Sequence, residues 1–252
     1  MARLPWTALV VSLAGVCAWE LVSRAGWVSP LYFPAPSMIA HAIARLAGTG
    51  ELQTNLLASV KRLALGVLAG GLPGLALGLT MGWSLRARQQ LDPVVAALHP
   101  IPKIAILPLL MILFGLGEAP RVLVIAVAAF FPMTINAMAG VRQISPIHFE
   151  VAANYGARRR RVLTGVVLPG SLPLILAGAR IAVNSALVLT IAVELVASDD
   201  GLGAVMWMAR ETLRTEELYA MLVVVSILGI GMNVALQRLA ARVVPWQAQP
   251  EV

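Results

Sequence analysis

Charge is scarce in this sequence. Asp, Glu, Lys and Arg make up 12% of its 252 residues, whereas a soluble domain carries about 25%. Hydrophobic residues make up 59%, and the mean hydropathy is +0.84. Aromatic residues are few, at 6%, and the apolar runs are continuous instead of alternating as in a membrane β-barrel. These features exclude a soluble domain and predict an all-α integral membrane protein.

Cysteine and lysine are almost missing. The single cysteine, Cys17, lies inside the first apolar run, so there is no disulfide framework. Lys61 and Lys103 are the only lysines, and the net charge of +7 comes almost entirely from arginine. In a membrane protein we expect this excess of positive charge to set the orientation of the chain and to contact anionic lipid. We expect no nucleic-acid partner.

Motifs for nucleotide binding and covalent catalysis are absent. Neither lysine is preceded by the glycines of a GxxxxGK[ST] loop. The sequence has no GxSxG, no HExxH and no Cys/His cluster. We therefore expect a non-catalytic chain without a metal site or a cofactor of its own.

Six apolar segments are long enough to approach the roughly 20 residues that cross a bilayer. The first lacks a small-residue cleavage site and is interpreted as a retained helix, not a signal peptide. A short amphipathic helix is expected around Met38–Leu46, and one membrane domain is expected over 1–252. The predicted spans are 6–23, 60–83, 93–116, 122–139, 174–196 and 218–239.

Six spans place both termini on the same side of the membrane. If that side is the cytoplasm, its loops and tails carry ten arginines and the outer loops carry seven basic residues. The excess of positive charge inside favours an N-in, C-in orientation. The ten are Arg3, Arg86, Arg88, Arg142, Arg158, Arg159, Arg160, Arg161, Arg238 and Arg242.

Glycine recurs every four residues in the span 60–83. This spacing creates a face of small residues that lets another helix approach the backbone closely. The partner is either a helix packed tightly within the same chain or one in a moving or dimeric interface. The five glycines are Gly66, Gly70, Gly74, Gly78 and Gly82.

The span 93–116 is interrupted by His99-Pro100-Ile101-Pro102-Lys103. Non-helical backbone at membrane depth survives only where protein or a water-filled cavity covers it. Lys103 is therefore a candidate pathway residue. The alternative is that it extends from a helix end to the cytoplasmic surface.

Polar residues form a stripe on the span 174–196. Arg180, Asn184, Thr190 and Glu194 fall within an arc of about 120° on a helix. Such a stripe either lines a pathway or forms a structural hydrogen-bonded seam. In the span 122–139, Thr134 and Asn136 are similar candidates. The predicted substrate pathway or gate residues are Lys103, Asn136, Asn184, Thr190 and Glu194.

Asp199 and Asp200 precede a short apolar segment in the loop 197–217. Either aspartate can cap a helix that begins there. Two adjacent aspartates without further oxygen ligands are a poor metal site. We therefore expect a helix cap.

The polar stretch 145–169 separates two spans and has strong helix boundaries. Ser145 is a candidate N-cap with Pro146 at the first helical position, and Gly156 is a candidate stop. A second helix is expected from Ala157 to Leu168, where Pro169 and Gly170 end it. Arg158–Arg161 are interpreted as an orientation signal and lipid-facing patch, or as a contact with a cytoplasmic partner.

This stretch resembles the EAA loop of ABC importer permeases, in which EAA is followed by glycine and then by Ile-x-Leu-Pro. Here Glu150-Val151-Ala152 is followed by Gly156 and, after nine intervening residues, by Val166–Pro169. Val151 replaces alanine and Val166 replaces isoleucine. Further motifs resemble permeases of the nitrate, sulfonate and taurine group, although Ile112 stands where an aromatic is usual. They are Phe33–Ser37, Ile101-Pro102, Leu107–Leu109, Leu113–Glu118, Phe130–Pro132, Leu168–Pro173 and Val193–Gly203.

The resemblance implies a type I (MetI-like) importer fold with six transmembrane helices in the bacterial inner membrane. It implies a permease homodimer, two cytoplasmic ATPase subunits that bind ATP and Mg, and an extracytoplasmic binding protein. The segment 146–155 would be the coupling helix that docks on the ATPase. The implied ATPase-coupling residues are Glu150, Val151, Ala152, Tyr155, Gly156, Leu168 and Pro169.

The expected function is inward transport of a small anionic solute, such as a sulfonate, taurine or nitrate. The same machinery could import bicarbonate or a heterocyclic vitamin precursor. An ion-coupled secondary transporter would need a coupling-ion site and usually an internal repeat, which is not evident. A non-transporting scaffold would not need a broken span or an intramembrane polar stripe.

Overall fold

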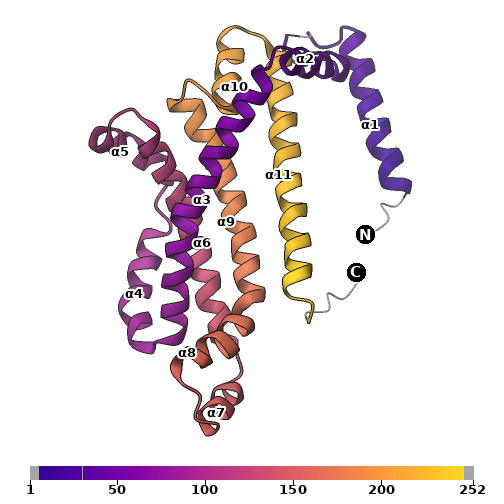
Figure 1. Ribbon diagram of the computed structural model, residues 1–252. Coiled ribbons are helices and arrows are strands. Elements are labelled where there is room, and N and C mark those ends of the chain that lie inside the picture. Colours follow the sequence, from indigo (N-terminus) through magenta and orange to yellow (C-terminus); the bar gives the residue numbers. More distant parts are fainter. Residues whose placement is uncertain (1–5, 30, 247–252) are drawn as a thin grey trace. The chain divides into compact units, whose positions relative to one another are not determined.

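The computed structural model describes residues 6–29 and 31–246, and these residues form helices and no strands (Figure 1). The predicted all-α class is confirmed. Arg3, counted above on the cytoplasmic side, lies outside the described residues. A 3₁₀-helix covers Lys103–Ile106 and a π-helix covers Leu163–Val167. The α-helices are α1 Trp6–Arg24, α2 Pro36–Gly48, α3 Glu51–Trp83, α4 Leu85–Leu98, α5 Leu107–Phe114, α6 Glu118–Arg142, α7 Pro146–Asn154, α8 Arg159–Val162, α9 Leu168–Ala197, α10 Leu202–Glu211 and α11 Thr215–Val243.

The chain divides into two compact units. The first unit comprises Met1–Ser59 and Glu194–Leu228, and the second comprises Val60–Val193 and Gly229–Val252. Helices α3, α9 and α11 contribute residues to both units.

Four helical segments are long and apolar enough to cross a membrane: Glu51–Trp83, Glu118–Arg142, Arg159–Ala197 and Thr215–Val243. The pair Leu85–Leu98 and Lys103–Phe114, bent by 87°, becomes a fifth if it is one broken span. The four segments contain the predicted spans 60–83, 122–139, 174–196 and 218–239, and the bent pair overlaps the predicted span 93–116 with its break at the predicted place. Helix α1 has 19 residues and coincides with the first predicted span, whose membrane crossing stays a prediction.

The helices are longer than the apolar runs because polar residues continue them. Helix α3 begins at Glu51, before the expected start of its span, and α11 begins with Thr215, Glu216 and Glu217, ahead of its expected start at 218. The amphipathic helix expected around Met38–Leu46 is α2.

Proline does not end the helix at Leu168, so that prediction is wrong. The helix that begins at Arg159 passes through the π-helix into α9 and continues beyond Pro169 and Pro173. A proline lacks the N–H that donates to the carbonyl four residues earlier. The π-turn directly before Pro169 changes the hydrogen-bond register there, so the chain passes the proline without stopping.

In the second unit, the glycine face of α3 packs directly on α6. A Cβ atom at Gly70 would overlap the carbonyl oxygen of Ala126, and one at Gly74 would lie 2.6 Å from the carbonyl oxygen of Phe130. A Cβ at Gly66, Gly78 or Gly82 would also collide with α6. The prediction of tight packing within the chain is confirmed.

In the first unit, the FPAPS segment anchors α1 beside the start of α2. Ser23 Oγ donates to the carbonyl of Phe33 at 2.8 Å, and the rings of Trp19 and Phe33 lie 5.1 Å apart. The Glu20 carboxylate accepts hydrogen bonds from the N–H of Ser37 at 3.0 Å and its hydroxyl at 2.7 Å. The segment Phe33–Ser37, one of the motifs that carry the family resemblance, therefore holds α1 against the start of α2.

Candidate functional site

Helix α7, in the second unit, has well-defined ends. Ser145 has an extended backbone before Pro146 but makes no side-chain cap hydrogen bond. At the other end Gly156 has φ +65°, the left-handed conformation predicted for it. The N–H groups of Gly156 and Ala157 donate to the carbonyls of Ala153 and Ala152, both at 2.9 Å. This pattern is a Schellman motif and fixes the bend after α7.

The surface of α7 is unpacked, and none of its residues is buried. Ile147, Val151 and Tyr155 are spaced by four and share one face of the helical turns, with 54%, 47% and 88% exposed. Glu150 is exposed beside this stripe, and Ala152 is half-buried. An exposed apolar stripe at this spacing is typical of a helix that docks into a groove.

The remaining two coupling candidates lie at the start of α9. Leu168 and Pro169 are half-buried, and Pro169 lines a cavity of about 300 Å³ together with Ser145 and His148. Position 169 is therefore brought close to the start of α7. Five of the seven candidates lie on α7 and its terminal turn, and Leu168 and Pro169 lie on the helix that follows.

The run Arg158–Arg161 concentrates positive charge in the second unit. Arg158, Arg160 and Arg161 line a hollow of about 540 Å³ with Gly156 and Thr164. No carboxylate among residues 6–29 and 31–246 forms an ion pair with any member of Arg158–Arg161. Their positive charge is available to an anionic partner or to lipid.

A cavity of about 500 Å³ in the second unit joins two predicted pathway residues, Lys103 and Asn184. Lys103 follows the break between α4 and the 3₁₀-helix, whereas Asn184 lies on α9. The lining residues are His99, Lys103, Ile104, Ala128, Pro132, Asn184, Ser185, Val188 and Leu189.

Lys103 is half-buried at the edge of this cavity. Its Nζ donates to the carbonyl of His99 at 2.6 Å and lies 5.7 Å from the ring centroid of Phe131. Within the described part of the chain no carboxylate forms an ion pair with it. Among the described residues, the ammonium group at this bend therefore contacts a carbonyl and an aromatic ring but no carboxylate.

Asn184 is paired with Asn233, a residue of α11 that the sequence interpretation missed. Asn233 Nδ2 donates to Asn184 Oδ1 at 2.9 Å, and Asn184 Nδ2 donates to Asn233 Oδ1 at 3.3 Å. Arg180 Nε donates to the same Asn233 oxygen at 2.8 Å. An amide in the middle of the apolar run 218–239 was the signal that could have identified it.

Asn136 and Thr190 are not among the residues that line the cavity. Asn136 Nδ2 donates to the carbonyl of Pro132, and Thr190 Oγ1 donates to that of Ala186, both at 2.8 Å. Thr190 is fully buried, and Asn136 packs where Gly178 has no Cβ. Both side chains are satisfied by carbonyls one turn back on their own helices.

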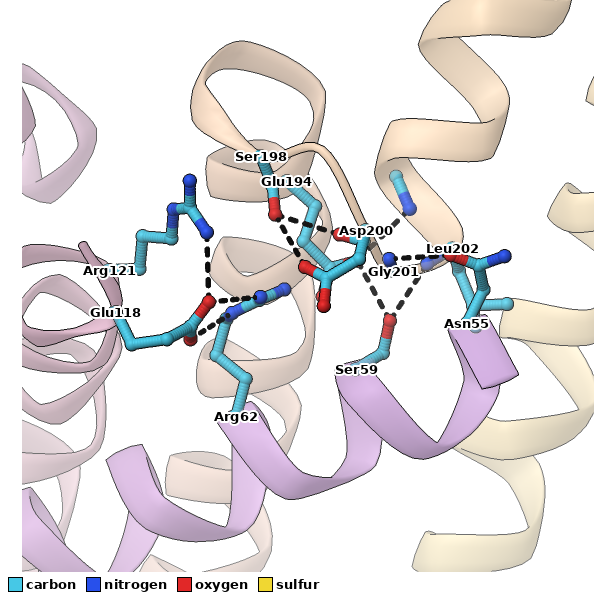
Figure 2. A network of polar contacts seen from close by, with 11 residues as sticks. Asn55, Ser59, Arg62, Glu118, Arg121, Glu194, Ser198, Asp200, Gly201 and Leu202 are labelled. Atoms are coloured by element: carbon cyan, nitrogen blue, oxygen red, sulfur yellow. Dashed lines mark hydrogen bonds and ion pairs between the residues drawn. The ribbon is translucent and has the colours of Figure 1, made fainter. Parts of the chain in front are cut away.

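Glu194 lies in the first unit and has no exposed surface. Its Oε2 accepts hydrogen bonds from Ser59 Oγ at 2.8 Å and from the N–H of Gly203 at 3.0 Å (Figure 2). Ser59 Oγ accepts from the N–H of Leu202 at 2.8 Å, so side chains of α3 and α9 satisfy N–H groups at the start of α10.

The aspartate cap expected for α10 is therefore wrong. Gly201 is the N-cap and makes no side-chain cap bond, and its N–H donates to Asn55 Oδ1 at 2.8 Å. Gly201 has φ +103°, and a Cβ there would lie 2.5 Å from Glu194 Oε1. Close approach of the chain to the Glu194 carboxylate excludes a side chain at the cap position.

A second polar cluster in Figure 2, within the second unit, centres on Glu118. Arg62 donates to its two oxygens at 2.9 and 2.7 Å, and Arg121 Nη1 donates at 2.8 Å. The Arg62 side chain is only 2% exposed. This fork-like contact ties α3 to the first turn of α6. A buried arginine inside an apolar run was the sequence signal for it.

Comparison with known proteins supports the interpretation of these motifs. Residues 74–249 match the family described as "binding-protein-dependent transport system inner membrane component". The chain is 35% identical over 236 residues to the taurine transport system permease protein TauC of Escherichia coli, covering 92% of this chain and 86% of the relative. It is 32% identical over 232 residues to the putative aliphatic sulfonates transport permease protein SsuC of Bacillus subtilis, with 92% and 84% covered.

A nitrate import permease protein, NrtB of Leptolyngbya laminosa, is 30% identical over 202 residues, covering 80% of this chain and 72% of the relative. These relatives confirm the resemblance to the nitrate, sulfonate and taurine group. In a solved inward-facing structure of the MetNI methionine ABC transporter, one chain superposes with a TM-score of 0.66 at 18% identity, covering 73% of this chain and 92% of that one. That likeness confirms the MetI-like fold. The chain belongs to the family of binding-protein-dependent transport system inner membrane components, the permease subunits of ABC importers.

Proposed function

We propose that this chain forms the transmembrane pathway of an ATP-driven importer for a small anionic solute of the sulfonate, taurine or nitrate type. The observation that carries the proposal is the similarity along 92% of the chain to permeases named for taurine and aliphatic sulfonates. A nitrate permease is similar over 80% of it. The substrates named for these relatives share an oxyanion group.

The energy enters through α7 and its terminal turn, which we place in the cytoplasm in an N-in, C-in arrangement. The exposed stripe of Ile147, Val151 and Tyr155 supports docking into a groove of an ATPase subunit, with Glu150 at its edge. The Schellman turn at Gly156 makes the docked helix a short lever attached to α9.

The proposed assembly contains two copies of the permease and two ATPase subunits, which bind ATP and Mg and carry out hydrolysis. This chain is then a non-catalytic subunit. A binding protein delivers the solute at the extracytoplasmic face. The Arg158–Arg161 run, which forms no ion pair with a described residue, contacts anionic lipid or the ATPase surface.

Within the membrane domain we place Lys103 and Asn184 on the solute pathway, because they line one cavity. Asn136, Thr190 and Glu194 make hydrogen bonds inside their own unit. Two roles were expected for these residues, lining a pathway or forming a structural hydrogen-bonded seam. Their contacts favour the seam.

Uptake measurements in the cell of origin test the proposal. Deletion of the gene should abolish accumulation of one labelled anion among taurine, ethanesulfonate and nitrate, and a plasmid copy should restore it. If only bicarbonate or a heterocyclic vitamin precursor accumulates, that compound replaces the sulfonate, taurine or nitrate as the proposed substrate. Uptake that survives ATP depletion but collapses with the ion gradient, from a protein that never retains an ATPase, would replace the importer with a secondary transporter.

A further inference from the structure

The cavity beside the helix break points to a ligand chemistry. We propose that the cavity lined by Lys103, Asn184 and Ser185 binds an oxyanion head group that carries a short apolar chain, as in an alkanesulfonate. This inference rests on the proposed transport function and adds to it a binding site for the solute and a preferred class of solute. The volume of about 500 Å³ falls within the range of small-molecule sites.

Hydrogen-bond donors are available on one part of the lining. An ammonium group has three N–H donors, and Lys103 uses one of them on the carbonyl of His99. Asn184 Nδ2 gives one N–H to Asn233, which leaves the other. The Ser185 hydroxyl makes no hydrogen bond to any described residue. These groups together match the acceptor oxygens of a sulfonate.

The charge of the lining favours an anion. Lys103 contributes a positive charge, and none of the nine lining residues is acidic. A cation in this cavity would meet the Lys103 ammonium without a carboxylate to offset the repulsion. An anion would form charge-assisted hydrogen bonds in a partly buried setting, where they are stronger than in water.

Apart from the ring of His99, the rest of the lining is apolar. Ile104, Ala128, Pro132, Val188 and Leu189 carry no side-chain donor or acceptor. A bare inorganic anion would leave this surface in contact with water, whereas a short alkyl chain would cover it. The cavity therefore favours an organic sulfonate over nitrate.

Asn233 holds the amide of Asn184 in place. The two amides exchange hydrogen bonds at 2.9 and 3.3 Å, and Arg180 fixes the Asn233 oxygen at 2.8 Å. Asn233 is thus a positioning residue, because it orients Asn184 without lining the cavity.

A binding experiment on the full chain tests the site. The probe is labelled butanesulfonate, and the protein is held in nanodiscs of phosphatidylcholine. Lys103→Gln should weaken binding by at least about tenfold, because a charge-assisted hydrogen bond is lost, whereas Lys103→Arg should stay within about threefold. The matched control is Lys61→Gln. Lys61 is the only other lysine of the sequence and lies at an exposed position of α3, so this variant should bind like the unmodified protein.

Equal binding by Lys103→Gln and the unmodified protein overturns the site. Nitrate binding as tight as butanesulfonate binding overturns the role of the apolar lining. An anionic lipid head group offers the same oxyanion chemistry. Displacement of the probe when phosphatidylglycerol is added to the nanodiscs would assign the cavity to lipid instead.

A labelling experiment covers the case in which Lys103 variants fail to fold. The chain has one cysteine, so Cys17→Ser combined with Ser185→Cys gives a single thiol at the cavity. Relative to each reagent's rate with a small free thiol, a sulfonate-bearing methanethiosulfonate should react faster there than its trimethylammonium counterpart, and butanesulfonate should slow the reaction. Equal relative rates with both reagents and no protection overturn the site.

Uptake in cells separates this inference from the proposed function. If no anion accumulates in an ATP-dependent manner, the proposed function fails, and the inference that rests on it fails with it. If the unmodified chain and Lys103→Gln accumulate butanesulfonate equally, only the cavity assignment fails.

Discussion

Ser59 on α3 donates a hydrogen bond of 2.8 Å to Glu194 on α9, and at most 1% of either residue is exposed. The same Ser59 oxygen accepts the N–H of Leu202, and Glu194 accepts the N–H of Gly203. One hydroxyl and one carboxylate therefore serve as acceptors for N–H groups that have no partner within α10. In the first unit this pair fixes where α10 begins.

Loss of the Ser59 hydroxyl should destabilise the protein. Ser59→Ala leaves the Leu202 N–H and one interaction of Glu194 unsatisfied, at a cost of about 1–3 kcal/mol. Thermal unfolding of the detergent-solubilised chain measures this. Ser226→Ala is the matched control because that exposed hydroxyl only donates to the carbonyl of Leu222 on its own helix, so its effect should stay within about 0.5 kcal/mol. Equal melting temperatures of the two variants would contradict the anchoring role.

Comparing the effects of a Glu194 substitution on stability and on transport distinguishes a structural role of this residue from a role in the solute pathway. We expect Glu194→Ala to lower the melting temperature, while uptake per folded molecule stays near that of the unmodified protein. The reason is that its hydrogen bonds lead to α3 and α10 and its side chain is fully buried. Uptake that falls further than the amount of folded protein would place Glu194 on the pathway instead.

Close packing of α3 on α6 makes Gly70 intolerant of any side chain. Gly70→Ala places a methyl group against the backbone carbonyl of Ala126, which cannot rotate away, and should cost about 1–3 kcal/mol. Gly231→Ala, on α11, meets no atom within 4 Å and should be neutral or stabilising by up to about 1 kcal/mol. Yield and melting temperature report both effects. A Gly70→Ala variant as stable as Gly231→Ala would show that the two helices separate easily.

Features governed by local physics were predictable from the sequence. Gly156 was predicted to end a helix, and it takes the left-handed conformation that such a helix end uses. The glycine spacing of α3 predicted a close helix contact, and the prolines around Ile101 predicted the bend. In each case the signal lies within one short segment, although the partner of the glycine face, α6, lies elsewhere in the chain.

Features that depend on distant partners were not predictable. Ser59 and Glu194 are 135 positions apart, so nothing near Asp199 or Asp200 revealed that α10 is capped by α3 and α9. Asn233 pairs with Asn184 across helices, and the π-turn lets α9 pass Pro169. Tertiary contacts replaced the local cap at α10, whereas at Pro169 the π-turn, a local change of hydrogen-bond register, replaced the expected stop.

The bend after α7 should depend on the absence of a side chain at Gly156. Gly156→Ala forces an alanine to φ +65°, which costs about 1–2 kcal/mol and loosens the Schellman turn. Gly165→Ala is the control, because position 165 lies in the nearby π-helix, has no atom within 4 Å of its added methyl and has no positive φ. We expect substrate-stimulated ATP hydrolysis to fall in the first variant only. Equal hydrolysis in both would remove the bend from the coupling mechanism.

The apolar stripe of α7 should determine attachment of the ATPase. Val151→Asp introduces a charge between Ile147 and Tyr155, and burying that charge in a docking groove would cost several kcal/mol unless it were paired. Ala153→Asp adds the same charge to an exposed position on the opposite face of the same helix, about 200° away. Copurification of the ATPase with the tagged permease should be lost in Val151→Asp and retained in Ala153→Asp, with both proteins inserted equally. Loss in both variants would mean that helix charge, not the stripe, controls docking, and retention in both would remove Val151 from the interface.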